Sequence, residues 1–159
     1  MSGYTFTQAD GSDRVVHGYK YAPPPAGHKR YTLGSARASR LPGKVDLRSA
    51  MTDVEDQKNT NSCAANATAG AYEYLIKRHM GDEAYDVSRL FIYYNARAVV
   101  DPENIEDEGS VLHHVIGSLK ENGACSEQTW PFDPESVNEA PSEDAYEEAR
   151  GFLIEETEL

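Results

Sequence analysis

The chain has 159 residues, of which 39% are hydrophobic and 9% aromatic, and its formal net charge at pH 7 is −12. This length suits one domain with a real buried core, and no apolar run approaches the roughly 20 residues that a membrane-spanning helix needs. The charge is uneven, since residues 1–50 carry eight Lys or Arg against three acids, while residues 101–159 carry two against seventeen. Such an acidic body argues against nucleic-acid binding through phosphate contacts, and we expect no membrane partner.

The first 40 residues predict an N-terminal extension or linker, not a core element. They are poor in aliphatic residues, and the run YAPPPAG at 21–27 favours extended, polyproline-like backbone. The start of the chain has neither the basic region nor the apolar region of a secretory signal. Two cysteines, one of them a candidate nucleophile, leave no expected disulfide, which fits a reducing compartment. We therefore expect a cytoplasmic location.

Residues 56–65, DQKNTNSCAA, place Gln57 six residues before Cys63, which opens a run of small residues. A thiolate that attacks a carbonyl needs donors for the oxyanion that forms. At the first turn of a helix, the helix dipole favours the thiolate, and the Cys63 N–H and the Gln57 carboxamide are candidate oxyanion donors. This spacing alone fits a small buried cysteine and a polar loop glutamine equally well, but the cap-rich residues 59–62 favour an accessible Cys63.

Four helices are predicted downstream. The first covers 63–78 and is followed by Gly81 as a C-terminal cap, and the second covers 89–98 after the N-cap Ser88. A third starts after a predicted cap at Ser110, carries apolar residues at helical spacing and ends at Gly123. A fourth covers 142–150, and a strand is expected to begin at 151–155. The order is helices first, with a sheet only at the end.

Several blocks of sequence resemble papain-family cysteine peptidases in the right order over about residues 41–133. The blocks are LPGKVDLR at 41–48, VEDQ at 54–57, SCAANA at 62–67, SRLFIYYN at 88–95, DEGS at 107–110, and NGAC at 122–125 through WPF at 130–132. The chain departs from the family signature at Asn61, where a glycine is usual, and at Ala64, where an aromatic is usual. Thr60 stands where many secreted members have a disulfide cysteine, so the chain resembles the disulfide-free prokaryotic branch.

The resemblance implies an α+β papain-like fold and a cysteine-type peptidase that forms a thioester on Cys63, with Gln57 as an oxyanion donor. It also implies that the backbone around Gly109 and Ser110 pairs with an extended peptide or protein substrate. The family's histidine base and its orienting Asn or Asp lie about 130–150 residues after the nucleophile. Residues 41–159 are therefore expected to form mainly the helical half of the domain, incomplete at the C-terminus and inactive alone.

The remaining polar residues offer no substitute for that base. His113 and His114 are expected to be surface or partly packed residues of the third helix, and Cys125 a buried apolar thiol. The spacing of cysteines and histidines matches no metal-ligand set, so no metal and no cofactor is predicted.

Two other functions stay open. One is a non-catalytic remnant or peptide-binding module, and the other is a thiol hydrolase or transferase that acts on non-peptide amides. The oligomeric state is not predicted.

Overall fold

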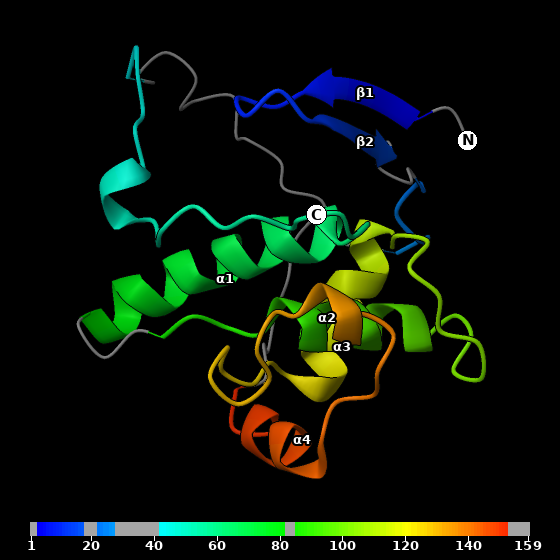
Figure 1. Ribbon diagram of the computed structural model, residues 1–159. Coiled ribbons are helices and arrows are strands. Elements are labelled where there is room, and N and C mark those ends of the chain that lie inside the picture. Colours follow the sequence, from blue (N-terminus) through cyan, green and yellow to red (C-terminus); the bar gives the residue numbers. More distant parts are fainter. Residues whose placement is uncertain (1–2, 18–21, 28–41, 82–84, 153–159) are drawn as a thin grey trace.

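The computed structural model describes residues 3–17, 22–27, 42–81 and 85–152. Its elements in chain order are β1 (Gly3–Thr7), β2 (Asp13–His17), the short 3-10 helix η2 (Arg48–Ala50), α1 (Cys63–Met80), α2 (Arg89–Ala98), α3 (Leu112–Asn122), η4 (Pro134–Ser136) and α4 (Glu143–Ala149). The hairpin β1–β2 lies at one end of the molecule and α4 at the other, with α1, α2 and α3 between them (Figure 1). The described chain is therefore mostly helical with little strand, as expected for the helical half of an α+β fold.

The first helix begins at the predicted residue. α1 runs from Cys63 to Met80, and the C-cap Gly81, with φ of 61°, donates its N–H to the Lys77 carbonyl. A left-handed φ favours glycine at this position because glycine has no Cβ to clash. The alanine-rich first half of α1 buries Ala64, Ala65 and Ala69. Small side chains on this face allow neighbouring backbone to approach closely.

The caps predicted for α2 and α4 are confirmed. The Ser88 hydroxyl accepts a hydrogen bond from the Phe91 N–H, and the Ser142 hydroxyl accepts one from the Ala145 N–H. Each bond satisfies one of the N–H groups that the first turn of a helix leaves without a partner.

The cap predicted for α3 is wrong by one residue. Val111, and not Ser110, is the N-cap of α3, and no side chain caps this helix. The Ser110 hydroxyl is buried and bonds none of the described residues, so it caps no N–H group of α3. The C-cap Gly123 is as predicted.

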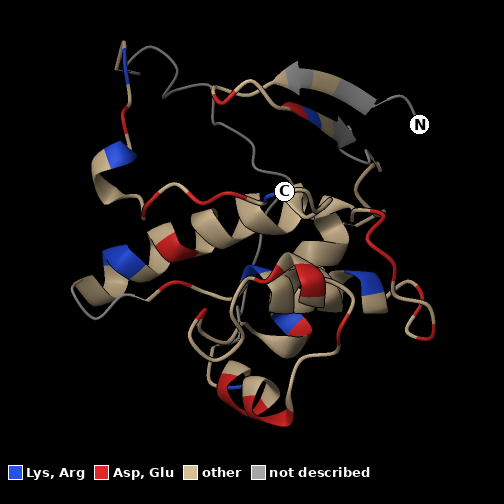
Figure 2. Ribbon diagram, in the orientation of Figure 1, with Lys and Arg blue, Asp and Glu red and all other residues tan. Residues whose placement is uncertain are grey.

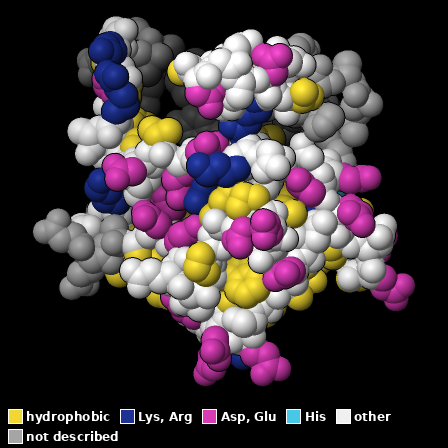
Figure 3. All heavy atoms as spheres, in the orientation of Figure 1, with side chains coloured by type: hydrophobic (Ala, Val, Ile, Leu, Met, Phe, Trp, Pro, Cys, Tyr) yellow, Lys and Arg dark blue, Asp and Glu magenta, His cyan; other side chains and the backbone are white. Residues whose placement is uncertain are grey.

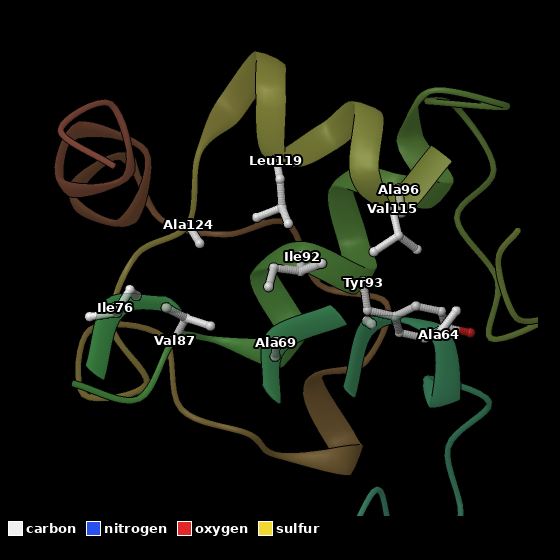
Figure 4. Packing of buried hydrophobic residues seen from close by; sticks show 11 residues of the cluster. Ala64, Ala69, Ile76, Val87, Ile92, Tyr93, Ala96, Val115, Leu119 and Ala124 are labelled. Atoms are coloured by element: carbon white, nitrogen blue, oxygen red, sulfur yellow. The ribbon is translucent and has the colours of Figure 1, made fainter. Parts of the chain in front are cut away.

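One hydrophobic cluster joins the three longer helices. α2 packs against both α1 and α3, and Ile92 and Tyr93 of α2 are fully buried in the middle of the cluster (Figure 4). Ala69 and Ile76 of α1 and Leu119 of α3 contribute from either side. Burial of large side chains such as these stabilises a fold by about 1.5–3 kcal/mol each.

A second, smaller cluster attaches α4 to the other side of α2. It contains Phe91, Cys125, Ala145 and Ala149, and the Phe91 and Tyr146 rings meet edge to face at 5.0 Å. Acidic residues lie on α4 and on the loops (Figure 2), and on the face seen in Figure 3 acidic side chains surround a central group of hydrophobic ones.

The hairpin is the element that the sequence did not predict. β1 and β2 pair antiparallel with Thr7 opposite Asp13, within the segment expected to be an extension or linker. The expectation that strands occur only at the end of the chain is therefore wrong. At that end Gly151 and Phe152 form a turn and a bend, and residues 153–155 of the predicted strand lie outside the described residues.

Glycine substitutions in α3 test the packing of α4. A Cβ built on Gly123 would lie 2.0 Å from the Ala149 carbonyl oxygen, and Gly123 has φ of 71°. Gly123→Ala should therefore lower the free energy of unfolding by more than about 1 kcal/mol. The matched control is Gly117→Ala, because a Cβ at Gly117 would meet nothing within 4 Å. This substitution should stabilise α3 by up to about 1 kcal/mol, since alanine favours a helix more than glycine does. Urea denaturation measures both, and equal effects of the two variants would contradict the described approach of α4 to Gly123.

Candidate active site

Cys63 is the first residue of α1 and is half-buried. Among the described residues its backbone N–H makes no hydrogen bond, as is usual for the first N–H groups of a helix. The preceding Ser62 is fully buried, and its hydroxyl bonds Thr60 Oγ1 at 2.7 Å and Asn66 Nδ2 at 2.8 Å. These bonds fix the backbone just before the thiol, so the free N–H and the sulfur emerge from a rigid turn.

Gln57 lies in a tight turn that leads to Cys63. Its Nε2 donates to the Thr60 carbonyl at 2.7 Å, and the Thr60 N–H and hydroxyl both bond back to the Gln57 carbonyl. Because a carboxamide nitrogen has two hydrogens, one N–H of Gln57 remains for another acceptor.

The same turn contains Lys58, whose φ of 52° is positive. Its N–H donates to the Asp56 carboxylate at 2.8 Å, which supports a backbone conformation that non-glycine residues rarely adopt. This bond, and then the Arg14 side chain of β2 at 3.0 Å, lower the pKa of Asp56 below its usual value. Asp56 thus joins the hairpin to the turn that carries Gln57.

Arg89 at the start of α2 anchors the segment before Gln57. It is nearly buried, and its Nη1 donates to the Asp56 carbonyl at 3.4 Å and to Asn66 Oδ1 at 3.2 Å. Its charge is balanced by Glu55, 3.0 Å from Nε, and by Glu127, 3.1 Å from Nη2. The Nε contact lacks hydrogen-bond geometry, so it is an ion pair. The Arg89 guanidinium therefore holds the segment just before Gln57 against α1.

Gly109 and Ser110 line a cavity of about 380 Å³ that extends towards Arg97 and His114. Among the described residues, that lining includes neither Cys63 nor Gln57. The Gly109 N–H is already taken by Tyr93, whereas the Ser110 backbone makes no hydrogen bond within the described chain and its buried Oγ has no partner. If this segment pairs with a substrate, Ser110 therefore offers the free backbone groups, and Gly109 offers its carbonyl.

The other sequence-predicted residues lie as follows. Cys125 is fully buried, and burial raises the pKa of its thiol to about 12. His113 and His114 are half-buried on α3 with ring centroids 4.3 Å apart, and burial lowers the pKa of His114. The described residues contain no group of three or more His, Cys, Asp or Glu side chains suited to a metal ion. None of the described helices combines the length and apolarity needed to cross a membrane.

Sequence reasoning missed Arg89, Tyr93 and Asp107 as contributors to this region. Tyr93 and Asp107 fall within the matched blocks 88–95 and 107–110, but their contacts with residues 61 and 109 join segments far apart in the chain. The sequence contains no local signal for such contacts.

Comparison with known proteins found relatives both in structure and in sequence. The chain is similar to xylellain, a cysteine protease from Xylella fastidiosa, with a TM-score of 0.72, 31% identity and coverage of 87% of this chain and 57% of that one. It also shares the fold of digestive procathepsin L 3 from the Tenebrio molitor larval midgut, with a TM-score of 0.55, 20% identity and coverage of 78% of this chain and 38% of that one.

A curated relative in sequence is an uncharacterized peptidase C1-like protein of Acanthamoeba polyphaga mimivirus. It is 38% identical over 107 residues, which are 67% of this chain and 33% of the relative. No family model matches the chain. The chain has a papain-like fold, and its relatives in structure and sequence include a cysteine protease and a peptidase C1-like protein. It spans about one third of the viral relative and 57% of xylellain, which fits an N-terminal portion of the fold.

The two thiols should differ in reactivity. Cys63 is half-buried, while Cys125 is fully buried with its pKa raised to about 12. Because the thiolate is the nucleophile, iodoacetamide at pH 7 should alkylate Cys63 well before Cys125, which should react only after unfolding. Mass spectrometry of tryptic peptides over time measures the two rates. Equal labelling of both cysteines in folded protein would contradict this placement of Cys63.

The burial of the Glu55 carboxyl should make stability depend on pH. Burial raises the pKa of Glu55 to about 7, and Arg89 opposes that shift. A folded-state pKa above the ordinary value of 4.5 means that the native state binds the proton more strongly. Protonated Glu55 therefore stabilises the folded state below pH 4.5, and this contribution to the free energy of unfolding is lost as the pH rises towards 7. Glu55→Gln should remove this part of the pH dependence in urea titrations, whereas Glu103→Gln, an exposed acid, should leave it unchanged.

Proposed function

We propose that this chain carries the nucleophile and the oxyanion donors of a cysteine-type peptidase. The observation that supports the proposal most directly is Cys63 at the first residue of α1, with a free backbone N–H and with Gln57 held in the turn before it. The similarity to xylellain, which is a cysteine protease, supports the same reaction class.

In the proposed reaction the Cys63 thiolate attacks the carbonyl carbon of a peptide bond. The carbonyl oxygen becomes an oxyanion that accepts hydrogen bonds from the Cys63 N–H and the second N–H of Gln57. The C–N bond then breaks, the amine leaves with a proton, and a thioester remains on Cys63. Water hydrolyses the thioester to release the acid and the thiol. The general base is a histidine, which the family resemblance places outside residues 1–159.

The substrate is a peptide or protein in an extended conformation. Ser110, with free backbone groups, and the Gly109 carbonyl would pair with it in the manner of an added strand. The net charge of −12 and the acidic residues on α4 and the loops (Figure 2) make nucleic acid a poor partner.

Cys63→Ala tests the nucleophile in the full-length gene product. Hydrolysis of a peptide substrate should be abolished, because no thioester forms without the thiol. Cys125→Ala is the matched control and should retain activity, since Cys125 is fully buried. A wild-type protein that binds peptides but never cleaves them would instead support the peptide-binding module.

Gln57→Ala tests the oxyanion donor. Loss of one such donor costs about two to three orders of magnitude in kcat, so this variant should stay folded and lose most of its kcat. Asn59→Ala, an exposed residue of the same turn, should lose little. If Gln57→Ala and Asn59→Ala had similar kcat values, Gln57 would not be an oxyanion donor.

A further inference from the structure

Asn61 lies between Gln57 and Cys63 and is bonded to a distant residue, Asp107. The Asn61 N–H lies 2.9 Å and 3.2 Å from the two carboxylate oxygens of Asp107, and Asn61 Nδ2 donates to the Asp107 carbonyl at 2.6 Å. Asn61 occupies the position where the family resemblance expects a glycine. A glycine would lack the side chain that reaches the Asp107 carbonyl. The replacement of the expected glycine by Asn61 therefore adds a hydrogen bond to Asp107.

The same carboxylate also holds α2. The Tyr93 hydroxyl donates to Asp107 Oδ1 at 2.6 Å and accepts the Gly109 N–H at 2.8 Å. Tyr93 is fully buried, and its ring points to the start of α1 beside Ala64 with the hydroxyl outermost (Figure 4). Burial, together with the bond to Asp107, raises the pKa of this phenol, which keeps it neutral and able to donate.

Arg97 fixes Tyr93 and the loop before Asp107. Its guanidinium lies 3.8 Å above the Tyr93 ring, and it donates to the Tyr93 carbonyl at 3.1 Å and the Glu106 carbonyl at 2.9 Å. It also bonds the Val137 carbonyl and Asn138 Oδ1. Tyr93 therefore has one well-supported position, and its hydroxyl is a fixed point between the Asp107 carboxylate and the Gly109 N–H.

We propose that Asp107 is a positioning residue that sets the distance between two segments of the candidate active site. One segment is the turn from Gln57 to Cys63, reached through Asn61, and the other is the proposed substrate-pairing segment of Gly109 and Ser110, reached through Tyr93. An ionised carboxylate suits this role because it only accepts hydrogen bonds, and here its partners are an N–H and an O–H. This proposal rests on the proposed peptidase function, since it assigns roles to these two segments.

Three variants of the full-length protein separate the two connections. Asp107→Asn puts an NH2 donor in place of one acceptor oxygen and should loosen both connections. Tyr93→Phe removes only the hydroxyl and should free the Gly109 N–H while leaving Asn61 bound. Glu103→Gln is the control, because it makes the same acid-to-amide change at an exposed position of the same loop.

Amide hydrogen exchange tests the connections without reference to activity. Asp107→Asn should speed exchange of the Asn61 and Gly109 N–H groups by at least about tenfold. The Asn61 N–H bonds the Asp107 carboxylate directly, and the Gly109 N–H bonds the Tyr93 hydroxyl that this carboxylate holds. Tyr93→Phe should speed exchange at Gly109 but not at Asn61, and Glu103→Gln should change neither. Unchanged exchange at both positions in Asp107→Asn would overturn the proposal even if the protein proves to be a peptidase.

Kinetics with a peptide substrate test the consequence. Tyr93→Phe should raise KM with little change in kcat, because only substrate binding is disturbed. Asp107→Asn should also lower kcat, so that kcat/KM falls by roughly tenfold to a hundredfold, as misplacement of a catalytic group by about 1 Å can cause.

If Asp107→Asn lowers the melting temperature but keeps wild-type kcat and KM well below that temperature, Asp107 has a purely structural role and the proposal is wrong. If Cys63→Ala leaves hydrolysis intact while the exchange pattern is as expected, the proposed function fails and the connections themselves stand.

Discussion

The close packing of α2 against the alanine-rich start of α1 is the constraint on which the rest of the site depends. Ala64, Ala65 and Ala69 leave room for α2, and the fully buried Tyr93 uses that room to reach the N-terminal end of α1. Its hydroxyl then donates to the Asp107 carboxylate, which also accepts the Asn61 N–H just before Cys63. A larger residue at one of these alanines would force α2 away, because well-packed cores accommodate added volume poorly.

Buried polar side chains on the helices hold the loops that carry the candidate site. Arg89 holds the segment before Gln57, Arg97 holds the loop before Asp107, and Glu73 of α1 accepts hydrogen bonds from Thr52 Oγ1 at 2.6 Å and from the Val87 N–H at 2.9 Å. Such groups are costly to bury without partners, and here each bonds loop backbone or a loop side chain, while Arg89 Nε is met by the Glu55 carboxylate as an ion pair. These contacts tie the loops to the helices that support them.

The parts of the fold that the sequence predicted depend on local interactions. The start of α1, the caps Ser88 and Ser142 and the terminating Gly123 each involve residues within about four positions of one another. The parts that it missed depend on distant contacts. The bond between the Tyr93 hydroxyl and the Gly109 N–H spans 16 residues, and the contact between Asn61 and Asp107 spans 46 residues. Their spacing and the family resemblance made Cys63 and Gln57 candidate site residues but gave no sign of the contacts that hold their turn.

The turn from Gln57 to Cys63 is held without a covalent cross-link. Both cysteines are free, and Thr60, which stands where many secreted relatives have a disulfide cysteine, instead bonds the Gln57 carbonyl and Ser62 through its hydroxyl. A disulfide would hold the turn only under oxidising conditions, which also threaten a reactive thiol. Hydrogen bonds from Thr60 and Asn61 do not depend on redox conditions. The geometry of the candidate oxyanion site is therefore compatible with conditions that keep Cys63 reduced and able to act as a nucleophile.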